Sequence, residues 1–302
     1  MADGEYDVMI LGSGPAGLQA AIHAARAKAS VLVLGRPQTS SIYRAHIENY
    51  CCMGKTSGED LLREGRNQAE RSGARFSTED VVKLWQEAPW FLTKTESGAT
   101  IRTRTLVLAM GVSRHKLNVP GEKELLGRGV SYCVECDANF FRGQPVAVVG
   151  NGSAAATGAL TLLLFAGEVH LVCSGLQVSE VLAHHVRQSS IHLHEARKVT
   201  KILGDREVKA VALDDGAQIE VNGVFIELGA KGAVGLAGEL GVVLDAQTMQ
   251  FIVTNKKQET NVPGVYAAGD VCGLPWQLAK AVGEGCVAGL EAAAYAKRMR
   301  AA

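Results

Sequence analysis

The segment that most constrains the fold is Gly12-Ser13-Gly14-Pro15-Ala16-Gly17, a glycine-rich turn between two apolar segments. An apolar run over residues 6–11 precedes it and predicts a buried strand, and the Ala-rich run that follows predicts a helix over about residues 16–29. A second strand over residues 31–34 completes a β-α-β unit. In this setting the first glycine permits the tight turn, the second lets the backbone approach a pyrophosphate, and the third lets helix and strand pack closely. The pattern predicts a dinucleotide-binding turn.

One part of this fingerprint is missing. The second strand should end in an acidic residue that binds a ribose hydroxyl, but the chain reads Leu34-Gly35-Arg36 there. Either the backbone binds the ribose or the cofactor is held in another way.

The same unit occurs a second time. A strand over residues 145–149 leads into Gly150-Asn151-Gly152-Ser153-Ala154-Ala155, then an Ala- and Leu-rich helix and a strand over residues 168–172. Alanine in the third glycine position is permitted. Beyond the second strand stand Cys173-Ser174-Gly175, with neither an acid for the ribose of NAD nor an arginine for the phosphate of NADP. The sequence therefore predicts the fold of a nicotinamide domain without its selectivity residues.

Between the two turns lies Cys133-Val134-Glu135-Cys136-Asp137. Cysteines at i and i+3 share one face of a helical turn, close enough to form a disulfide, and a helix start also favours the thiolate. The alternative is half of a zinc site, which needs a second pair of ligands. The other cysteines and the eight histidines form no such spaced set, so we favour a redox centre.

Composition limits the protein's class and partners. With 302 residues the chain can form one or two domains, and equal numbers of acidic and basic residues (31 each) give no indication of a nucleic-acid partner. The seven cysteines follow no secreted framework. We expect no signal peptide, and the apolar runs are interrupted well before the roughly 18 residues of a membrane span. The sequence predicts a soluble, cytoplasmic protein with no metal site.

Three further segments carry expectations. The adjacent pair Cys51-Cys52 would form a strained ring as a disulfide, so we expect buried or inactive thiols. A helix is expected over about residues 57–72, capped by Ser57. The histidines His184, His185, His192 and His194 are interpreted as surface residues in a polar stretch with strand alternation.

Taken with the C-terminal segment Gly264-Val265-Tyr266-Ala267-Ala268-Gly269-Asp270-Val271, these motifs resemble those of low-molecular-weight thioredoxin reductases over nearly the full length. The Cys133–Asp137 segment is similar to that family's Cys-Ala-Thr-Cys-Asp motif. Glu48-Asn49-Tyr50 resembles its Glu-Asn-Trp flavin contact, and residues 141–150 match the run into its second nucleotide turn.

The resemblance implies an α/β fold of two Rossmann-like nucleotide-binding domains, each with three ββα layers, the second inserted into the first. An FAD domain would comprise residues 1–116 and 247–302, and a degenerate NAD(P)H-type domain with the redox centre residues 117–246. A homodimer and a rotation between the domains are expected. The predicted cofactor-binding residues are Gly12, Gly14, Pro15, Ala16, Gly17, Gly35, Arg36, Asn49, Val82, Ala109, Gly111, Gly269, Asp270, Trp276, Gln277 and Leu278.

The resemblance also assigns three catalytic residues. Cys136 would face the flavin and form the charge-transfer thiolate, and Cys133 would attack the substrate disulfide. Asp137 would be the acid/base group. The expected acceptor is thioredoxin or a similar protein dithiol.

Departures from the family decide the expected electron donor. The family's arginines for the 2′-phosphate are replaced by Cys173-Ser174-Gly175, and its Arg-Gln near the flavin is Trp276-Gln277. Loss of two charge-assisted contacts, each worth roughly 1.5–3 kcal/mol, would weaken NADP binding by orders of magnitude. Trp276 either stacks on the flavin, closing the face that a nicotinamide would occupy, or serves ordinary packing.

This pattern resembles the pyridine-nucleotide-independent branch, which includes ferredoxin-dependent flavin thioredoxin reductases and diflavin-linked disulfide oxidoreductases. Ferredoxin is the expected donor and NADPH is not expected to bind. A second flavin in the vacant nicotinamide region stays open. Two alternatives remain at this stage: NAD(P)H-dependent reduction with an atypical phosphate site, and a non-catalytic flavin and dithiol redox sensor.

Overall fold

The computed structural model describes residues 4–112, 116–132, 134–228, 233–247 and 249–301. The chain divides into two compact units, of which unit 1 comprises residues 1–113 and 232–302 and unit 2 comprises residues 114–231. One unit is thus inserted into the other. The predicted boundary at 246/247 was wrong, because residues 232–246 belong to unit 1. There Leu236 and Ala237 of α6 (Ala233–Glu239) join the core that contains Met9, and Glu239 accepts a hydrogen bond from the Leu84 amide at 2.7 Å.

Unit 1 is built on a mainly parallel sheet with strand order β5-β2-β1-β8-β7-β6. β1 pairs in parallel with β2 and β8, β17 pairs in parallel with β8, and β6 and β7 add an antiparallel hairpin. The strands are β1 (Glu5–Leu11), β2 (Val31–Leu34), β5 (Arg75–Ser77), β6 (Val81–Glu87), β7 (Trp90–Thr95), β8 (Thr100–Leu108) and β17 (Val265–Ala267). β1, β2 and β8 are buried along most of their length, as expected for a parallel sheet covered on both faces.

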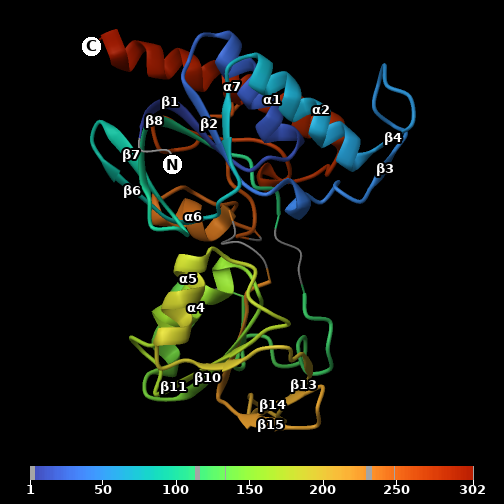
Figure 1. Ribbon diagram of the computed structural model, residues 1–302, viewed down its shortest axis with the longest axis vertical. Helices are drawn as coiled ribbons and strands as arrows, with labels where there is room; N and C mark the ends of the chain where they lie inside the picture. The colour runs from blue at the N-terminus through green and yellow to red at the C-terminus, as the bar shows by residue number, and fades with distance from the viewer. Residues whose placement is uncertain (1–3, 113–115, 133, 229–232, 248, 302) are drawn as a thin grey trace. The chain divides into compact units, whose positions relative to one another are not determined.

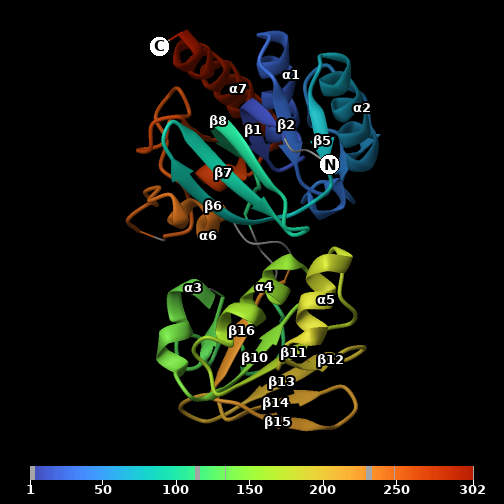
Figure 2. The ribbon, with the colours of Figure 1, turned by 60° about the vertical axis from the view of Figure 1, so that its left-hand side comes forward.

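Helix α1 (Pro15–Arg26) packs against both α2 (Gly58–Arg71) and α7 (Leu278–Ala301) along one side of this sheet (Figures 1 and 2). Ser57 caps α2 by accepting a hydrogen bond from the Asp60 amide at 3.1 Å, which confirms the predicted cap. Unit 1 also contains the short hairpin β3 (His46–Ile47) and β4 (Thr56–Ser57), with 3-10 turns η1 (Pro37–Thr39) and η3 (Asp270–Cys272).

Unit 2 has a five-stranded parallel sheet of order β12-β11-β10-β16-β9 and a separate antiparallel sheet of order β13-β14-β15. One core lies between the parallel sheet and α4 and α5, and another lies between it and the antiparallel sheet. Three layers of ββα type result, as predicted. The strands are β9 (Val130–Ser131), β10 (Pro145–Val149), β11 (Glu168–Val172), β12 (His192–His194), β13 (Val199–Leu203), β14 (Ala210–Leu213), β15 (Gln218–Glu220) and β16 (Gly223–Ile226). The helices are α3 (Val134–Asp137), η2 (Ala138–Phe141), α4 (Ser153–Leu162) and α5 (Glu180–Gln188).

His184, His185 and His192 are exposed, which confirms three of the four predicted surface histidines, and two other features differ from the expectation. His184 and His185 are exposed on helix α5, not on a strand. His194 is half-buried, and its Nε2 lies 3.1 Å from Nδ1 of the buried His170, whose Nε2 lies 3.3 Å from Glu168. Strand registry places these residues together, since His170 pairs with His192 and Val172 with His194. Among the described residues, no group of side chains is arranged to hold a metal ion, and none of the helices is both long enough and apolar enough to cross a membrane.

Candidate nucleotide turns and dithiol segment

The first glycine-rich turn connects β1 to α1 in the geometry that a dinucleotide requires. Gly12 has a φ of +110°, and a Cβ there would lie 2.3 Å from the Ala109 carbonyl oxygen. A Cβ at Gly17 would lie 1.9 Å from the Gly12 carbonyl oxygen, so the helix sits against the turn. Helix α1 starts at Pro15 and Ala16, and its N-cap, Gly14, makes no side-chain capping bond. The first amides of the helix are therefore available for an anion.

A buried hydroxyl marks the same place. Ser13 is buried, and its Oγ has no hydrogen-bond partner in the part of the chain that the structure describes. The residue after β2 packs against the Ser13 backbone, since a Cβ at Gly35 would lie 3.2 Å from the Ser13 amide nitrogen. Because a buried hydroxyl without a partner costs free energy, Ser13 and the uncapped helix together fit the pyrophosphate of a dinucleotide such as FAD.

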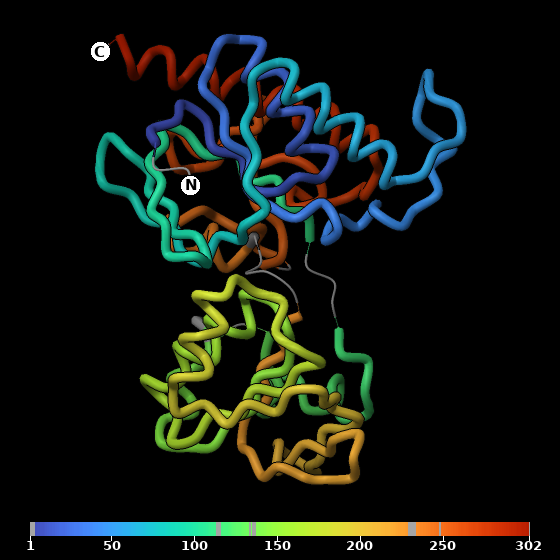
Figure 3. Tube along the Cα trace, in the orientation of Figure 1, coloured from blue at the N-terminus to red at the C-terminus, as the bar shows by residue number. Residues whose placement is uncertain are grey.

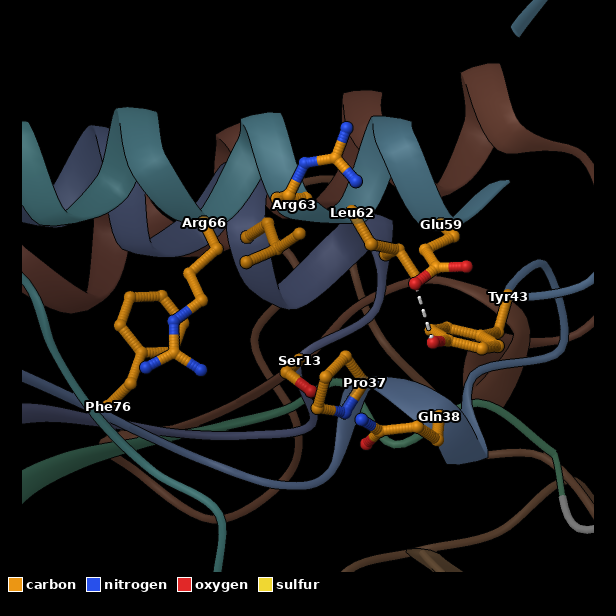
Figure 4. A pocket seen from close by; sticks show the side chains of 10 residues that line it. Ser13, Pro37, Gln38, Tyr43, Glu59, Leu62, Arg63, Arg66 and Phe76 are labelled. Carbon is orange, nitrogen blue, oxygen red and sulfur yellow. Dashed lines mark hydrogen bonds between the residues drawn. The ribbon is translucent and has the colours of Figure 1, made fainter. Parts of the chain in front are cut away.

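A pocket extends from Ser13 to helix α2 (Figure 4). At one end of the pocket the Tyr43 hydroxyl donates to Glu59 at 2.9 Å, and at the other end the Arg66 guanidinium lies 4.8 Å from the centre of the Phe76 ring (Figure 4). The pocket is lined by Ser13, Leu18, Pro37, Gln38, Tyr43, Glu59, Leu62, Arg63, Arg66 and Phe76. Sequence reasoning missed Tyr43 and the two arginines, although Arg63 and Arg66 stand three residues apart on an expected helix.

Arg36, which follows β2 where a ribose-binding acid was expected, forms ion pairs with two carboxylates. Its guanidinium binds Asp80 and Glu96, both of which are buried. The pairs tie the end of β2 to the segments that precede β6 and follow β7. The side chain is thus occupied, and the backbone at Gly35 and Arg36 is the part that could face a ribose.

Three strand ends of unit 1 meet at one edge of the sheet. The Ala109 amide donates to the Leu11 carbonyl at 2.8 Å, and the Ala268 amide donates to the Leu108 carbonyl at 3.0 Å. These bonds bring together the segments that contain the predicted residues Gly12, Ala109 and Gly111, and Gly269 and Asp270. The carboxyl edge of a parallel sheet is where such folds bind ligands.

Helix α7 contacts both this edge of the sheet and helix α1. The Gly269 amide donates to Glu284 at 2.8 Å, and Lys280 Nζ donates to the Gly269 carbonyl at 2.8 Å. A Cβ at Gly285 would lie 2.2 Å from the Ala16 carbonyl oxygen, so the two helices are in backbone contact. Gly269 is thereby held close to the first turn of α1.

The structure joins two predicted flavin contacts that are far apart in sequence. Asn49 Nδ2 donates to Gln277 Oε1 at 3.2 Å, which links the β3–β4 hairpin to the residue before Leu278 at the start of α7. Trp276 is 38% exposed, and its ring lies 6.4 Å from that of Phe251. Val82 is half-buried on β6.

The second glycine-rich turn has a similar backbone. Gly150 has a φ of +155°, and a Cβ there would lie 2.0 Å from the Glu227 carbonyl oxygen. Its surroundings differ, because the segment after β11 is bonded to it: the Gln177 amide donates to the Asn151 carbonyl at 2.7 Å. That segment, residues 173–179, contains no lysine or arginine.

A carboxylate follows the strand that packs against this second turn. Glu227 follows β16, and its Oε1 accepts from the Val134 amide at 3.3 Å. Its Cγ would lie 3.9 Å from a Cβ at Gly158 of α4, so the side chain lies between α3 and α4. Sequence analysis missed Glu227, which is the last polar residue of an otherwise apolar strand segment.

The dithiol segment enters a short helix as predicted. Cys136 and Asp137 belong to α3, which begins at Val134, and Asp137 is half-buried. Cys133 lies outside the described residues. In the preceding residue, the Tyr132 hydroxyl donates to Glu122 at 2.6 Å. The pKa of Tyr132 is raised mainly by burial and secondarily by this hydrogen bond.

Four of the remaining thiols form two pairs with different surroundings, and Cys286 is half-buried. Burial raises the pKa of Cys173, and it raises the pKa of Cys272 to about 12, so both stay protonated and unreactive. Cys51 and Cys52 are both exposed. The prediction allowed for either buried or inactive thiols. The pair is not buried, so that part of the prediction was wrong.

Fold and sites together define a class of protein with two nucleotide-binding units, one of which carries a dithiol segment. Residues 6–285 match the family described as pyridine nucleotide-disulphide oxidoreductase, and the chain belongs to that family. It is 38% identical to the thioredoxin reductase of Aquifex aeolicus (strain VF5) over 95% of this chain and 92% of that protein.

Two solved structures resemble it along nearly their whole length. The atypical thioredoxin reductase from Desulfovibrio vulgaris Hildenborough has a TM-score of 0.81 with 34% identity, covering 97% of this chain and 98% of the other. A ferredoxin-flavin thioredoxin reductase from Clostridium acetobutylicum has a TM-score of 0.67 with 31% identity, covering 99% of each chain. The protein is a flavin-dependent disulfide oxidoreductase of the thioredoxin reductase type.

Proposed function

We propose that this enzyme reduces thioredoxin, or a similar protein disulfide, through Cys133 and Cys136 with electrons from a non-nicotinamide donor, a ferredoxin. FAD would bind at the first glycine-rich turn, against the predicted residues at the strand ends and at Asn49 and Gln277. The acceptor is supported by relatives named thioredoxin reductase, and the donor by the solved ferredoxin-flavin thioredoxin reductase.

The observation that carries the choice of donor is the state of the second nucleotide turn. An NADPH pyrophosphate and 2′-phosphate need hydrogen-bond donors and cations, but residues 173–179 offer no cation. Glu227 packs against the turn through its backbone carbonyl and adds a carboxylate between α3 and α4, and the Gln177 amide is hydrogen-bonded to the Asn151 carbonyl of the turn. A negative charge near a phosphate site opposes binding. The site therefore favours a donor that does not occupy it.

When bound, FAD would accept two electrons from one-electron donors and deliver them as a pair to a disulfide. The chain's own residues would do the rest. The Cys133 thiolate would attack the substrate disulfide, and Cys136 would then displace the reduced product from the mixed disulfide. Asp137, half-buried at the end of α3, would hold the proton that the departing thiolate takes up.

The test is steady-state reduction of thioredoxin, measured by its free thiols under anaerobic conditions with either reduced ferredoxin or NADPH. We expect turnover with ferredoxin alone. Cys136→Ser should abolish that turnover while FAD remains bound, and the matched control Cys173→Ser should leave turnover unchanged because Cys173 is buried. Turnover that persists in Cys136→Ser would refute the dithiol assignment, and equal turnover with NADPH would refute the donor assignment.

A further inference from the structure

The β3–β4 hairpin carries a second pair of thiols. Its strands pair His46 with Ser57 and Ile47 with Thr56, and the hairpin projects from the start of α2 (Figures 1 and 3). Cys51 and Cys52 lie in the loop between the strands, and both are exposed and unbridged. Met53, beside them, is 44% exposed. The loop is therefore accessible to an incoming disulfide.

The two sulfur atoms are already in contact. Cys51 Sγ and Cys52 Sγ are 3.4 Å apart, so forming a disulfide bond of about 2.05 Å requires an approach of roughly 1.4 Å. Cys52 adopts a φ of +65°, in the left-handed region, so the chain turns sharply between the two residues. The pair is poised to react with itself more readily than with a distant thiol.

The ring that would form is easily reopened. Adjacent Cα atoms are about 3.8 Å apart, which is less than the usual ~4.4–6.8 Å span of a disulfide. The resulting strain makes a bond more oxidising and more readily reduced. Strained, exposed disulfides of this kind are labile, unlike the structural disulfides of secreted proteins. The pair is therefore suited to reversible modification.

We propose that Cys51 and Cys52 are a redox-modification site that closes to a vicinal disulfide by exchange with an incoming disulfide R–S–S–R. One cysteine thiolate attacks a sulfur of R–S–S–R, forming a mixed disulfide and releasing the first thiolate, which takes up a proton. The second cysteine then attacks the sulfur of the first, breaking the mixed disulfide and releasing the second thiol. Two cysteines are oxidised and one disulfide is reduced to two thiols, so electrons and atoms balance.

The hairpin also transmits the state of the pair. Asn49, two residues before Cys51, donates to Gln277 at 3.2 Å and so links the hairpin to the start of α7. Ring closure changes the backbone at residues 51–52 and displaces Asn49 from this contact. Since Asn49 and Gln277 are proposed flavin contacts, this second step rests on the proposed function. Closure should weaken FAD binding about fivefold, the effect of one lost hydrogen bond.

The first test uses the full-length protein and oxidised glutathione as the probe, followed by alkylation, trypsin and mass spectrometry. Cleavage after Arg44 and Lys55 isolates both cysteines in one peptide. We expect the wild-type peptide to lose two hydrogens, to resist alkylation and to carry no glutathione. Cys51→Ser and Cys52→Ser, which cannot close the ring, should each retain one glutathione. A stable glutathione adduct on the wild-type pair, or full alkylation after oxidation, would overturn the proposal.

The second test measures FAD retained after ultrafiltration of oxidised protein. Wild type should lose more FAD than the double variant Cys51→Ser/Cys52→Ser treated in parallel, whose retention should not change on oxidation. Ring closure without any loss of FAD would refute the coupling to Gln277. If the untreated protein does not reduce thioredoxin with electrons from ferredoxin, the proposed function is refuted instead. The peptide measurement does not depend on that activity.

Discussion

The two glycine-rich turns of this enzyme share a backbone and differ in what surrounds it. Gly12 and Gly150 both have positive φ, and a Cβ at either would meet a carbonyl oxygen, at 2.3 Å and 2.0 Å respectively. The first turn opens onto a buried hydroxyl with no partner among the described residues and onto a pocket with two arginines. The second is hydrogen-bonded to the Gln177 amide and packs against the backbone of Glu227, whose carboxylate accepts from the Val134 amide.

The difference shows which residues determine the fold and which determine whether a ligand binds. Glycines at the tight turns and apolar strands build a β-α-β unit in both places. Whether a dinucleotide then binds depends on the side chains around the turn, which can change without disturbing the backbone. In our account, unit 2 retains the nucleotide-binding fold to hold the dithiol segment.

The largest expected effect separates the two turns directly. Gly12→Ala should destabilise the protein by about 3 kcal/mol or more, because the Cβ meets backbone and the φ is unfavourable, and it should empty the flavin site. Gly150→Ala should cost similar stability, yet the folded fraction should keep its FAD. The measurements are chemical unfolding and the flavin-to-protein absorbance ratio.

Gly98→Ala is the matched control for these variants. Gly98 also has a positive φ, +88°, but nothing lies within 4 Å of its Cβ position. It should cost only about 1 kcal/mol and leave FAD bound. If Gly12→Ala keeps full FAD while Gly150→Ala loses it, the two turns have been assigned the wrong way round.

An intermediate effect should follow from restoring charge to the second turn. Ser174→Arg with Glu227→Gln supplies a cation and removes the anion while keeping an acceptor for the Val134 amide. NADPH should bind about tenfold or more tightly than to wild type, as one charge-assisted phosphate contact implies. The exposed Ser190→Arg adds the same charge elsewhere and serves as the control. Isothermal titration of NADPH measures the difference, and equal affinities in all three proteins would show that charge does not limit binding.

The smallest effect concerns pH and is confined to unit 2. Burial lowers the pKa of His170 and of His194 from 6.5, with Glu168 opposing the shift at His170 and His192 adding to it at His194. The unfolded chain then binds more protons, so stability is full above about pH 6.5 and is lost as pH falls through the lowered values. Urea unfolding between pH 8 and pH 5 should show this loss.

His170→Gln tests the origin of that loss. Glutamine keeps a polar side chain but does not titrate, so the variant should lose less stability on acidification than wild type. An unchanged pH dependence would mean that the loss comes from carboxylates elsewhere in the chain.

Sequence reasoning predicted the features that local pattern determines. Both β-α-β units, the helix capped by Ser57 and the three-layer architecture follow from glycine spacing, apolar runs and the family resemblance, and all are confirmed. The roles assigned to individual site residues stay predictions.

Other features depend on distant partners and could not be predicted. Arg36 meets Asp80 and Glu96 only because three loops converge, and nothing around those acids marks them as buried. The boundary at 246/247 failed for the same reason, since α6 is short and its packing partner β6 is far away in sequence. His170 and His194 meet through strand registry, which no local pattern specified.

The proposed function requires that unit 2 does not bind a nicotinamide nucleotide productively. An anaerobic titration of the purified protein with NADPH and NADH, followed by flavin absorbance, tests it most directly. We expect the flavin to stay oxidised in the presence of excess NADPH or NADH and to be bleached when reduced ferredoxin is added to the same cell. Rapid bleaching by a stoichiometric amount of NADPH would refute the ferredoxin assignment and make the enzyme an NADPH-dependent thioredoxin reductase with a rebuilt phosphate site.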